Sequence, residues 1–200
     1  MVKIIGLTGS IATGKSFVAD IIKNELHYPL IDADKLAREI VEINKPAYNE
    51  IVKNFGENIL KKNKELDRRT LRELIFNNTE NRNLLNKITH KYIRQEYQKK
   101  VNEYQKKGHE MIFYDVPLLF EAKLENEFYK IIVVYIPQQL QIKRLINRDN
   151  ISETEAIKTI KSQINIEEKR KLADFIIDNS TTRENTREQI INIINTIKEY

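Results

Sequence analysis

The sequence predicts an α/β protein whose core is a parallel sheet of five strands. Short apolar runs alternate along the chain with segments in which apolar residues recur at helical spacing, and this alternation is typical of parallel sheets covered by helices. The first apolar run also leads directly into a loop with two glycines and then into a helix. The five expected strands cover residues 3–7, 29–32, 111–115, 130–136 and 175–178.

The loop after the first strand, residues 9–16, reads GSIATGKS. Gly9 and Gly14 allow the backbone to curl with its N–H groups pointing inward, and the following helix presents the positive end of its dipole. Lys15 supplies a positive charge for terminal phosphates, and Ser16 offers a hydroxyl to Mg²⁺. A glycine turn beside a solvated lysine is the alternative, but the flanking strand and helix favour a phosphate-binding loop. The expected helix carries its apolar residues on one side, at Phe17, Val18, Ile21, Ile22 and Leu26.

Two aspartates stand where the second expected strand meets a helix over residues 35–41. Ligands of open parallel sheets bind beyond the carboxyl ends of the strands, which makes Asp32 a candidate active-site residue. Asp34 has an ordinary structural explanation as the helix cap, with Arg38 as its ion-pair partner.

The middle of the chain, about residues 34–110, contains no expected strand and is interpreted as a helical insertion. Its helices are expected over residues 46–55, after a cap at Asp67, and over residues 80–107. From residue 60 to residue 110 there are fourteen Lys and Arg residues against seven Asp and Glu residues, within a chain of net charge +5. This excess suits a polyphosphate ligand or nucleic acid, although solvated helix surface explains most of these lysines.

The later strands and helices add further candidates. Asp115 ends the third strand and either holds Mg²⁺ through water or a hydroxyl, or only caps the strand. Arg144 and Arg148 share one face of a helix over residues 138–147, where arginines either close over phosphates or form surface ion pairs. Ser152 begins a capping box.

Composition limits the class of protein. The 200 residues suit one domain, and 40% hydrophobic with 32% charged residues is ordinary for a soluble chain. With no cysteine there is no disulfide framework and no thiol site. No apolar run approaches membrane-spanning length and no signal peptide is expected, so a cytoplasmic protein is predicted.

Together these motifs resemble the dephospho-CoA kinase family over nearly the whole chain. The matching segments are GLTG at 6–9 with GKS at 14–16, DAD at 32–34 with Arg38, LDR at 66–68 with LR at 71–72, DVPLLFE at 115–121, Gln141, Arg144, RD at 148–149, SQ at 162–163, AD at 173–174 and IDN at 177–179.

The resemblance implies a P-loop NTPase-type three-layer sandwich with a nucleotide core at about 1–33 and 111–200, a helical acceptor-binding insertion at about 34–110 and a lid at about 137–170. It implies ATP and Mg²⁺, and transfer of the γ-phosphoryl group to the ribose 3′-hydroxyl of dephospho-CoA. It implies no nucleic-acid or membrane partner, and a monomer or small homo-oligomer.

The resemblance also implies roles for individual residues. ATP would be bound by Ala12, Thr13, Gly14, Lys15, Ser16, Phe17 and Asn179, with Ser16 also holding the metal. The catalytic residues would be Asp32, Lys15 and Arg148. The acceptor would be bound by Asp32, Arg38, His90, Arg94 and Asp115. The chain departs from the family pattern at Ser10, Ala12 and Phe17, and at Lys91, where the family commonly has proline after the histidine.

Two other interpretations stay open from the sequence. The first is a kinase of the same fold that acts on a nucleoside or a small alcohol; a GTPase is disfavoured because the guanine-reading Asn-Lys-x-Asp pattern is absent. The second is a nucleic-acid-binding module, which predicts strongly salt-dependent binding and no acceptor-dependent ATP turnover.

Overall fold

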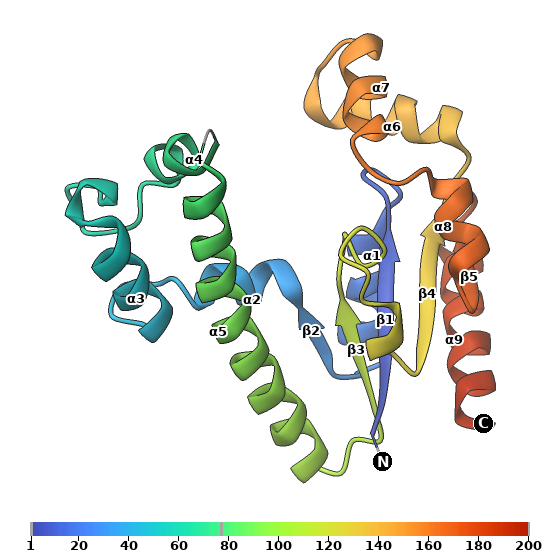
Figure 1. Cartoon of the computed structure of the whole chain (residues 1–200). Coiled ribbons are helices and arrows are strands. Elements are labelled where there is room, and N and C mark those ends of the chain that lie inside the picture. The colour runs from blue at the N-terminus through green and yellow to red at the C-terminus, as the bar shows by residue number, and fades with distance from the viewer. Residues whose placement is uncertain (1, 77, 200) are drawn as a thin grey trace. The chain divides into compact units, whose positions relative to one another are not determined.

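The computed structural model describes residues 2–76 and 78–199 (Figure 1). The sheet has the strand order β2-β3-β1-β4-β5, and β1 pairs in parallel with both β3 and β4, as β4 does with β5. The predicted five-stranded parallel sheet is therefore confirmed. The strands are β1 (Lys3–Gly9), β2 (Leu30–Asp32), β3 (Met111–Asp115), β4 (Lys130–Tyr135) and β5 (Phe175–Asp178).

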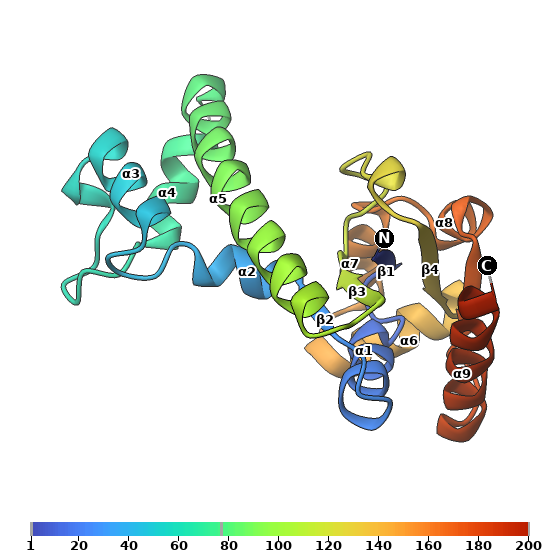
Figure 2. The same cartoon turned by 90° about the horizontal axis from the view of Figure 1, so that it is seen from below.

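Helices join the strands and cover both faces of the sheet. Figure 2 shows α1 and α9 on one side of the strands and α8 on the other. The α-helices of the described residues are α1 (Lys15–Asp20), α2 (Ala33–Glu39), α3 (Pro46–Phe55), α4 (Arg68–Phe76), α5 (Thr79–Lys106), α6 (Gln138–Asp149), α7 (Glu153–Lys161), α8 (Ile166–Leu172) and α9 (Arg183–Glu199).

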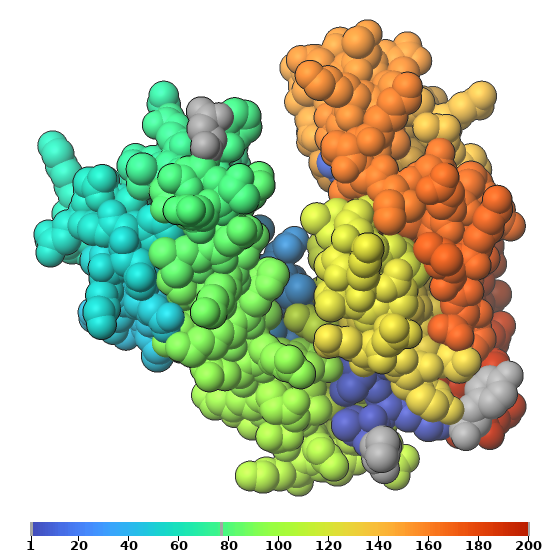
Figure 3. Space-filling model, in the orientation of Figure 1, coloured from blue at the N-terminus to red at the C-terminus, as the bar shows by residue number. Residues whose placement is uncertain are grey.

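The chain divides into two compact units, residues 1–31 with 107–200 and residues 32–106. In the first unit, apolar residues of α1 and α9 pack on the β-sheet in one buried cluster that includes Val18, Ile190 and Ile194. In the second, the side chains of α3 and α5, cyan and green in Figure 3, pack together with α4 around Ile51 and Ile88. No helix among residues 2–76 and 78–199 is both long and apolar enough to cross a membrane.

Local signals in the sequence set several helix ends. The Asp67 carboxylate accepts hydrogen bonds from the N–H groups of Arg69 (2.9 Å) and Thr70 (3.3 Å) at the start of α4. The capping box at Ser152 is present in full. Gly56 and Gly108, just beyond α3 and α5, have positive φ angles of 83° and 84°, which glycine adopts more readily than other residues.

The helix after the loop differs from the prediction. A regular helix was expected through Leu26, but a π-helix replaces it over Ile21–Glu25, and the Leu26 N–H donates to the Ile21 carbonyl at 2.9 Å. A π-turn holds more residues than an α-turn, and here the consecutive residues Ile21 and Ile22 are both fully buried. Burial of two adjacent isoleucines in one core explains the change.

Candidate active site

The loop between β1 and α1 depends on two residues in left-handed conformations. Gly14, directly before α1, has φ 86°, and a Cβ placed on it would lie 2.1 Å from Asn179 Nδ2. Ala12 has φ 62°, although it carries a side chain. The loop thus adopts its curled conformation with alanine instead of glycine at position 12, at the cost of strain at Ala12.

Lys15 and Asp115 meet at the carboxyl ends of two neighbouring strands. Leu7 of β1 is in register with Asp115 of β3, so this carboxylate lies beside the last residues of β1. The Lys15 ammonium forms an ion pair and hydrogen bond with Asp115 Oδ1, and both side chains are largely buried. Ser16, the next residue of α1, is exposed. The structure therefore brings together two predicted site residues that lie far apart in sequence.

Two glutamines hold the loop at Ile11. The Ile11 N–H donates to Gln163 Oε1 at 2.9 Å, and the Ile11 carbonyl accepts from Gln141 Nε2 at 2.7 Å. Gln141, on α6, is fully buried. Both glutamines belong to family motifs, but the sequence predicted no role for either. In the structure they hold the N–H and the carbonyl of Ile11 in place.

Asn179 makes hydrogen bonds that hold the other end of the loop, at Thr13. Its buried side chain donates to the Thr13 carbonyl at 2.9 Å and accepts from Thr186 Oγ1 at 3.1 Å. Its own carbonyl accepts a hydrogen bond from Arg144 Nη2 at 3.0 Å. Asn179, which the resemblance implies to be an ATP-binding residue, therefore holds the loop between β1 and α1 against the segment after β5.

Arg148 lies in the last turn of α6 and is exposed. Its guanidinium makes two hydrogen bonds to the adjacent Asp149 carboxylate, at 2.8 and 2.9 Å. These bonds raise the pKa of Arg148 and lower the pKa of Asp149. Any contact between Arg148 and a phosphate therefore has to replace or extend this pair.

The helix cap assigned to Asp34 was wrong. Asp32, in an extended conformation at the end of β2, is the N-cap of α2, and its Oδ1 accepts from the Lys35 N–H at 2.9 Å. Asp34 lies exposed within the first helical turn. The expected Asp34–Arg38 pair is not among the ion pairs of the described chain, where Lys35 and Glu39 pair along this helix at 3.7 Å. The helix begins one residue after the strand, so only Asp32 has the extended geometry of a cap.

A cavity of about 490 Å³ lies within residues 32–106. Arg38, Arg68 and Arg72 contribute positive charge to its lining, while Leu71 and Ile75 contribute apolar surface. The remaining lining residues are Asp34, Ala37, Val41, Ile51, Leu66, Leu85 and Thr89.

Three arginines line this cavity, but the sequence prediction named only Arg38. Arg68 and Arg72 belong to the family motifs at 66–68 and 71–72, and those motifs were the only sequence feature that could have predicted their place in the cavity. His90 and Arg94 are exposed residues of α5, and the lining that this helix gives the cavity is Leu85 and Thr89.

Comparison with known proteins decides the family. The family model for dephospho-CoA kinase matches residues 3–185. The chain belongs to the dephospho-CoA kinase family. A relative named dephospho-CoA kinase from Carboxydothermus hydrogenoformans is 46% identical over 191 residues, covering 96% of this chain and 92% of that protein. The protein is therefore a kinase of coenzyme A biosynthesis that phosphorylates dephospho-CoA with ATP.

Solved structures agree with this family assignment. The dephospho-CoA kinase of Campylobacter jejuni superposes with a TM-score of 0.72 at 37% identity, covering 100% of this chain and 98% of that one. A protein from Thermus thermophilus superposes with a TM-score of 0.82 at 28% identity, covering 98% and 97% of the two chains.

Proposed function

We propose that this chain transfers the γ-phosphoryl group of ATP to the ribose 3′-hydroxyl of dephospho-CoA, with the loop of residues 9–16 as the ATP phosphate site. The observation that carries the proposal is Lys15, largely buried beside Asp115 where two parallel strands end. Phosphoryl transfer depends mainly on positioning and on neutralising the charge of the phosphate oxygens, and this arrangement offers both.

In this proposal Lys15 and the main-chain N–H groups of the loop bind the phosphates of ATP. The Lys15 ammonium contacts the terminal phosphates of ATP, and Asp115 holds it in place before they bind. Thr13, Gly14 and Phe17 contribute main-chain N–H groups at the start of α1, together with those of Ala12.

The residues of the loop suit Mg²⁺. Mg²⁺ prefers oxygen ligands and keeps several waters beside substrate phosphates, so one protein hydroxyl is a sufficient anchor. Ser16 is exposed at the second position of α1, and no cluster of three His, Cys, Asp or Glu residues that could hold a metal exists among the described residues. When bound, the ion supplies positive charge to the phosphate oxygens.

Asp32 is our proposed general base. It stands at the carboxyl end of β2, where sheets of this kind place reacting groups. Its carboxylate orients the 3′-hydroxyl and accepts the proton as the oxygen–phosphorus bond forms. Arg148 neutralises the transferring group from the proposed lid.

The cavity within residues 32–106 is our proposed site for dephospho-CoA. Guanidinium groups bind phosphates through paired hydrogen bonds, so Arg38, Arg68 and Arg72 suit the pyrophosphate of the acceptor. The apolar lining around Leu71 and Ile75 suits the pantetheine arm. His90 and Arg94 support the same acceptor from the exposed side of α5.

An acceptor competition assay tests the function. ATP consumption is measured with dephospho-CoA, adenosine, AMP and shikimate, and only dephospho-CoA should give substantial turnover. Lys15→Ala should abolish nearly all transfer while the thermal midpoint stays close to that of wild type. Lys23→Ala, which removes an exposed lysine from the π-helix, is the matched control and should leave the rate unchanged. Near-normal kcat in Lys15→Ala would overturn the phosphate-site assignment.

The acceptor site is tested on one helix. Arg72→Gln should raise the KM for dephospho-CoA and leave the KM for ATP nearly unchanged. Arg69→Gln is the matched control, because Arg69 lies on the same helix with 88% of its side chain exposed and pairs with Glu73 instead. Equal effects of the two variants would show that α4 contributes only general charge.

A further inference from the structure

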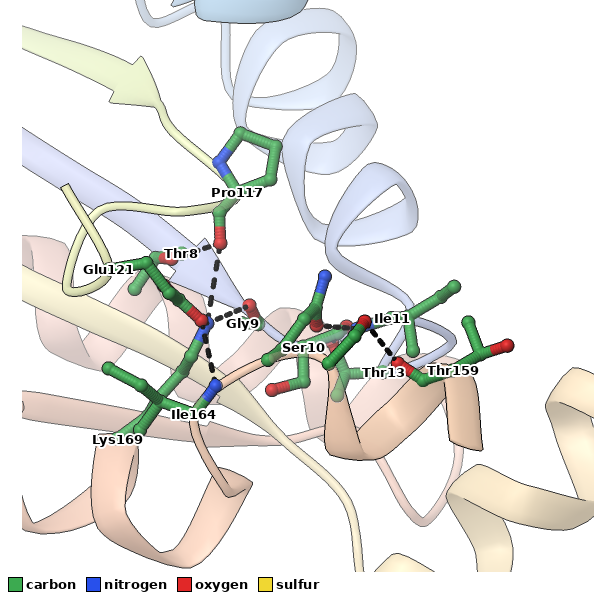
Figure 4. Close-up of polar contacts among 12 residues, drawn as sticks. Thr8, Gly9, Ser10, Ile11, Thr13, Pro117, Glu121, Thr159, Ile164 and Lys169 are labelled. Carbon is green, nitrogen blue, oxygen red and sulfur yellow. Dashed lines mark hydrogen bonds and ion pairs between the residues drawn. The ribbon is translucent and has the colours of Figure 1, made fainter. Parts of the chain in front are cut away.

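Lys169, on α8, has no exposed side-chain surface and lies beside the start of the phosphate-binding loop (Figure 4). Its Nζ atom lies 2.8 Å from Glu121 Oε1 and donates hydrogen bonds to the main-chain carbonyls of Gly9, at 3.2 Å, and Pro117, at 3.4 Å. An ammonium has three N–H donors, and these three acceptors match that number. Lysine is almost never fully buried unless its charge is paired, so these acceptors indicate what the residue does.

The two carbonyls belong to the backbone segments that carry the proposed catalytic charges. Gly9 is the last residue of β1 and begins the loop that leads to Lys15. Pro117 follows shortly after Asp115, and its carbonyl also accepts a hydrogen bond from Thr8 Oγ1 at 3.2 Å. One buried ammonium therefore ties the strand end before Lys15 to the segment after Asp115. Because a peptide unit is planar, holding the Gly9 carbonyl also fixes the plane in which the loop starts.

Glu121 extends this connection to the segment between α7 and α8. Its Oε1 accepts a hydrogen bond from the Ile164 N–H at 3.0 Å as well as pairing with Lys169. Its Oε2 is buried with no hydrogen-bond partner among the described residues. A buried ion pair with an unsatisfied oxygen is a poor source of stability, and well-packed neutral residues often do better. Stability is thus a weak explanation for this pair.

We propose that Lys169 is a positioning residue for phosphoryl transfer: it holds the carbonyls of Gly9 and Pro117 together and so fixes Lys15 relative to Asp115. The inference rests on the proposed role of Lys15 and Asp115 at the ATP phosphates. Lys169 itself contacts neither substrate. Its loss should act on kcat, because a small displacement of the loop misaligns the transferring group, while the KM for dephospho-CoA should stay near the wild-type value.

The test separates positioning from stability with a charge-neutral pair of substitutions. Lys169→Met alone leaves Glu121 as an unpaired buried charge and should lower the thermal midpoint. The double variant Lys169→Met/Glu121→Gln has no charge at these two positions and keeps an acceptor for the Ile164 N–H, so its midpoint should recover. Its kcat should remain lower than wild type by on the order of 10²-fold, the usual loss from slight misplacement of reacting groups.

Ile194→Ala, in the apolar cluster beneath α9, is the control for destabilisation away from the loop. It should lower the midpoint and keep kcat. Recovery of wild-type kcat in the double variant, or an equal loss of kcat in the control, would overturn the proposal. Wild-type protein is assayed first with dephospho-CoA, and no turnover there would reject the proposed acceptor. The role of Lys169 would then be tested by comparing the rate of ATP hydrolysis to water in the wild type, the double variant and the Ile194→Ala control.

Discussion

Replacing Asp32 by asparagine separates the two tasks of this carboxylate. As the N-cap of α2, Asp32 Oδ1 accepts a hydrogen bond from the Lys35 N–H at 2.9 Å. Asparagine caps helices about as well as aspartate, so Asp32→Asn keeps the cap. Only the negative charge at the helix N-terminus is lost, which costs ~0.3–1 kcal/mol. As a base, by contrast, asparagine cannot accept the proton of the acceptor hydroxyl.

The expected magnitudes distinguish these tasks. Loss of a positioned base lowers kcat by ~10²–10⁴-fold, which at 1.36 kcal/mol for each factor of ten is a barrier increase of ~2.7–5.4 kcal/mol. Asp32→Ala should lower kcat as much and also lose the cap, at a further cost of ~1 kcal/mol in the free energy of unfolding. In a chain of this size, that is a shift of ~2–4 °C in the thermal midpoint.

The assay measures kcat, the KM for ATP and for dephospho-CoA, and the thermal midpoint for Asp32→Asn, Asp32→Ala and Asp34→Asn. Asp34 is the comparison residue, because it lies exposed in the first turn of the same helix and does not cap it. Asp34 also lines the proposed acceptor cavity, so we expect Asp34→Asn to change the KM for dephospho-CoA and to keep kcat. We expect Asp32→Asn to keep its affinity for ATP. If Asp34→Asn abolishes turnover while Asp32→Asn keeps it, the assignment of the base is refuted.

Three further changes test the loop and the helical unit. Gly14→Ala should lower both the thermal midpoint and the rate, because its Cβ would stand 2.1 Å from Asn179 Nδ2 at a φ of 86°. The double variant Gly14→Ala/Asn179→Ala should lose less stability than the sum of the two single variants. Additive losses would argue against the clash. Ala12→Gly removes ~1–2 kcal/mol of left-handed strain and adds ~0.5–1 kcal/mol of backbone entropy cost, so the midpoint should hold or rise slightly; a clear fall would contradict the strain. The Tyr92 hydroxyl lowers the pKa of Glu50 by hydrogen bonding, together with Lys91. A lowered carboxyl pKa stabilises the folded state above the ordinary pKa, and this is lost as the pH falls through the lowered value; Tyr92→Phe should therefore raise the Glu50 pKa in an NMR titration and shrink that pH dependence, and an unchanged pKa would exclude the hydroxyl as its cause.

The sequence by itself determined the features that depend on neighbouring residues. Apolar runs specify buried strands wherever they fall, so the five strands were predictable, as was the loop of residues 9–16. The capping box at Ser152 and the helix ends at Gly56 and Gly108 follow from side-chain and backbone chemistry within a few residues. The prediction of Asp34 as the helix cap was wrong for a local reason as well, because a helix that starts a residue or two earlier presents its free N–H groups to a different side chain.

Only the tertiary structure decided which distant residues meet. Lys15 pairs with Asp115 because β1 and β3 are neighbours in register, and the order of strands in the sheet cannot be predicted from either segment alone. Gln163 and Lys169 reach the loop because α8 packs on β4, which places their segment beside the end of β1. Long-range packing of this kind depends on how whole surfaces fit together. Sequence motifs therefore included Lys15, Asp115 and Gln163 but not Lys169, and only the assembled sheet shows which residues each of them contacts.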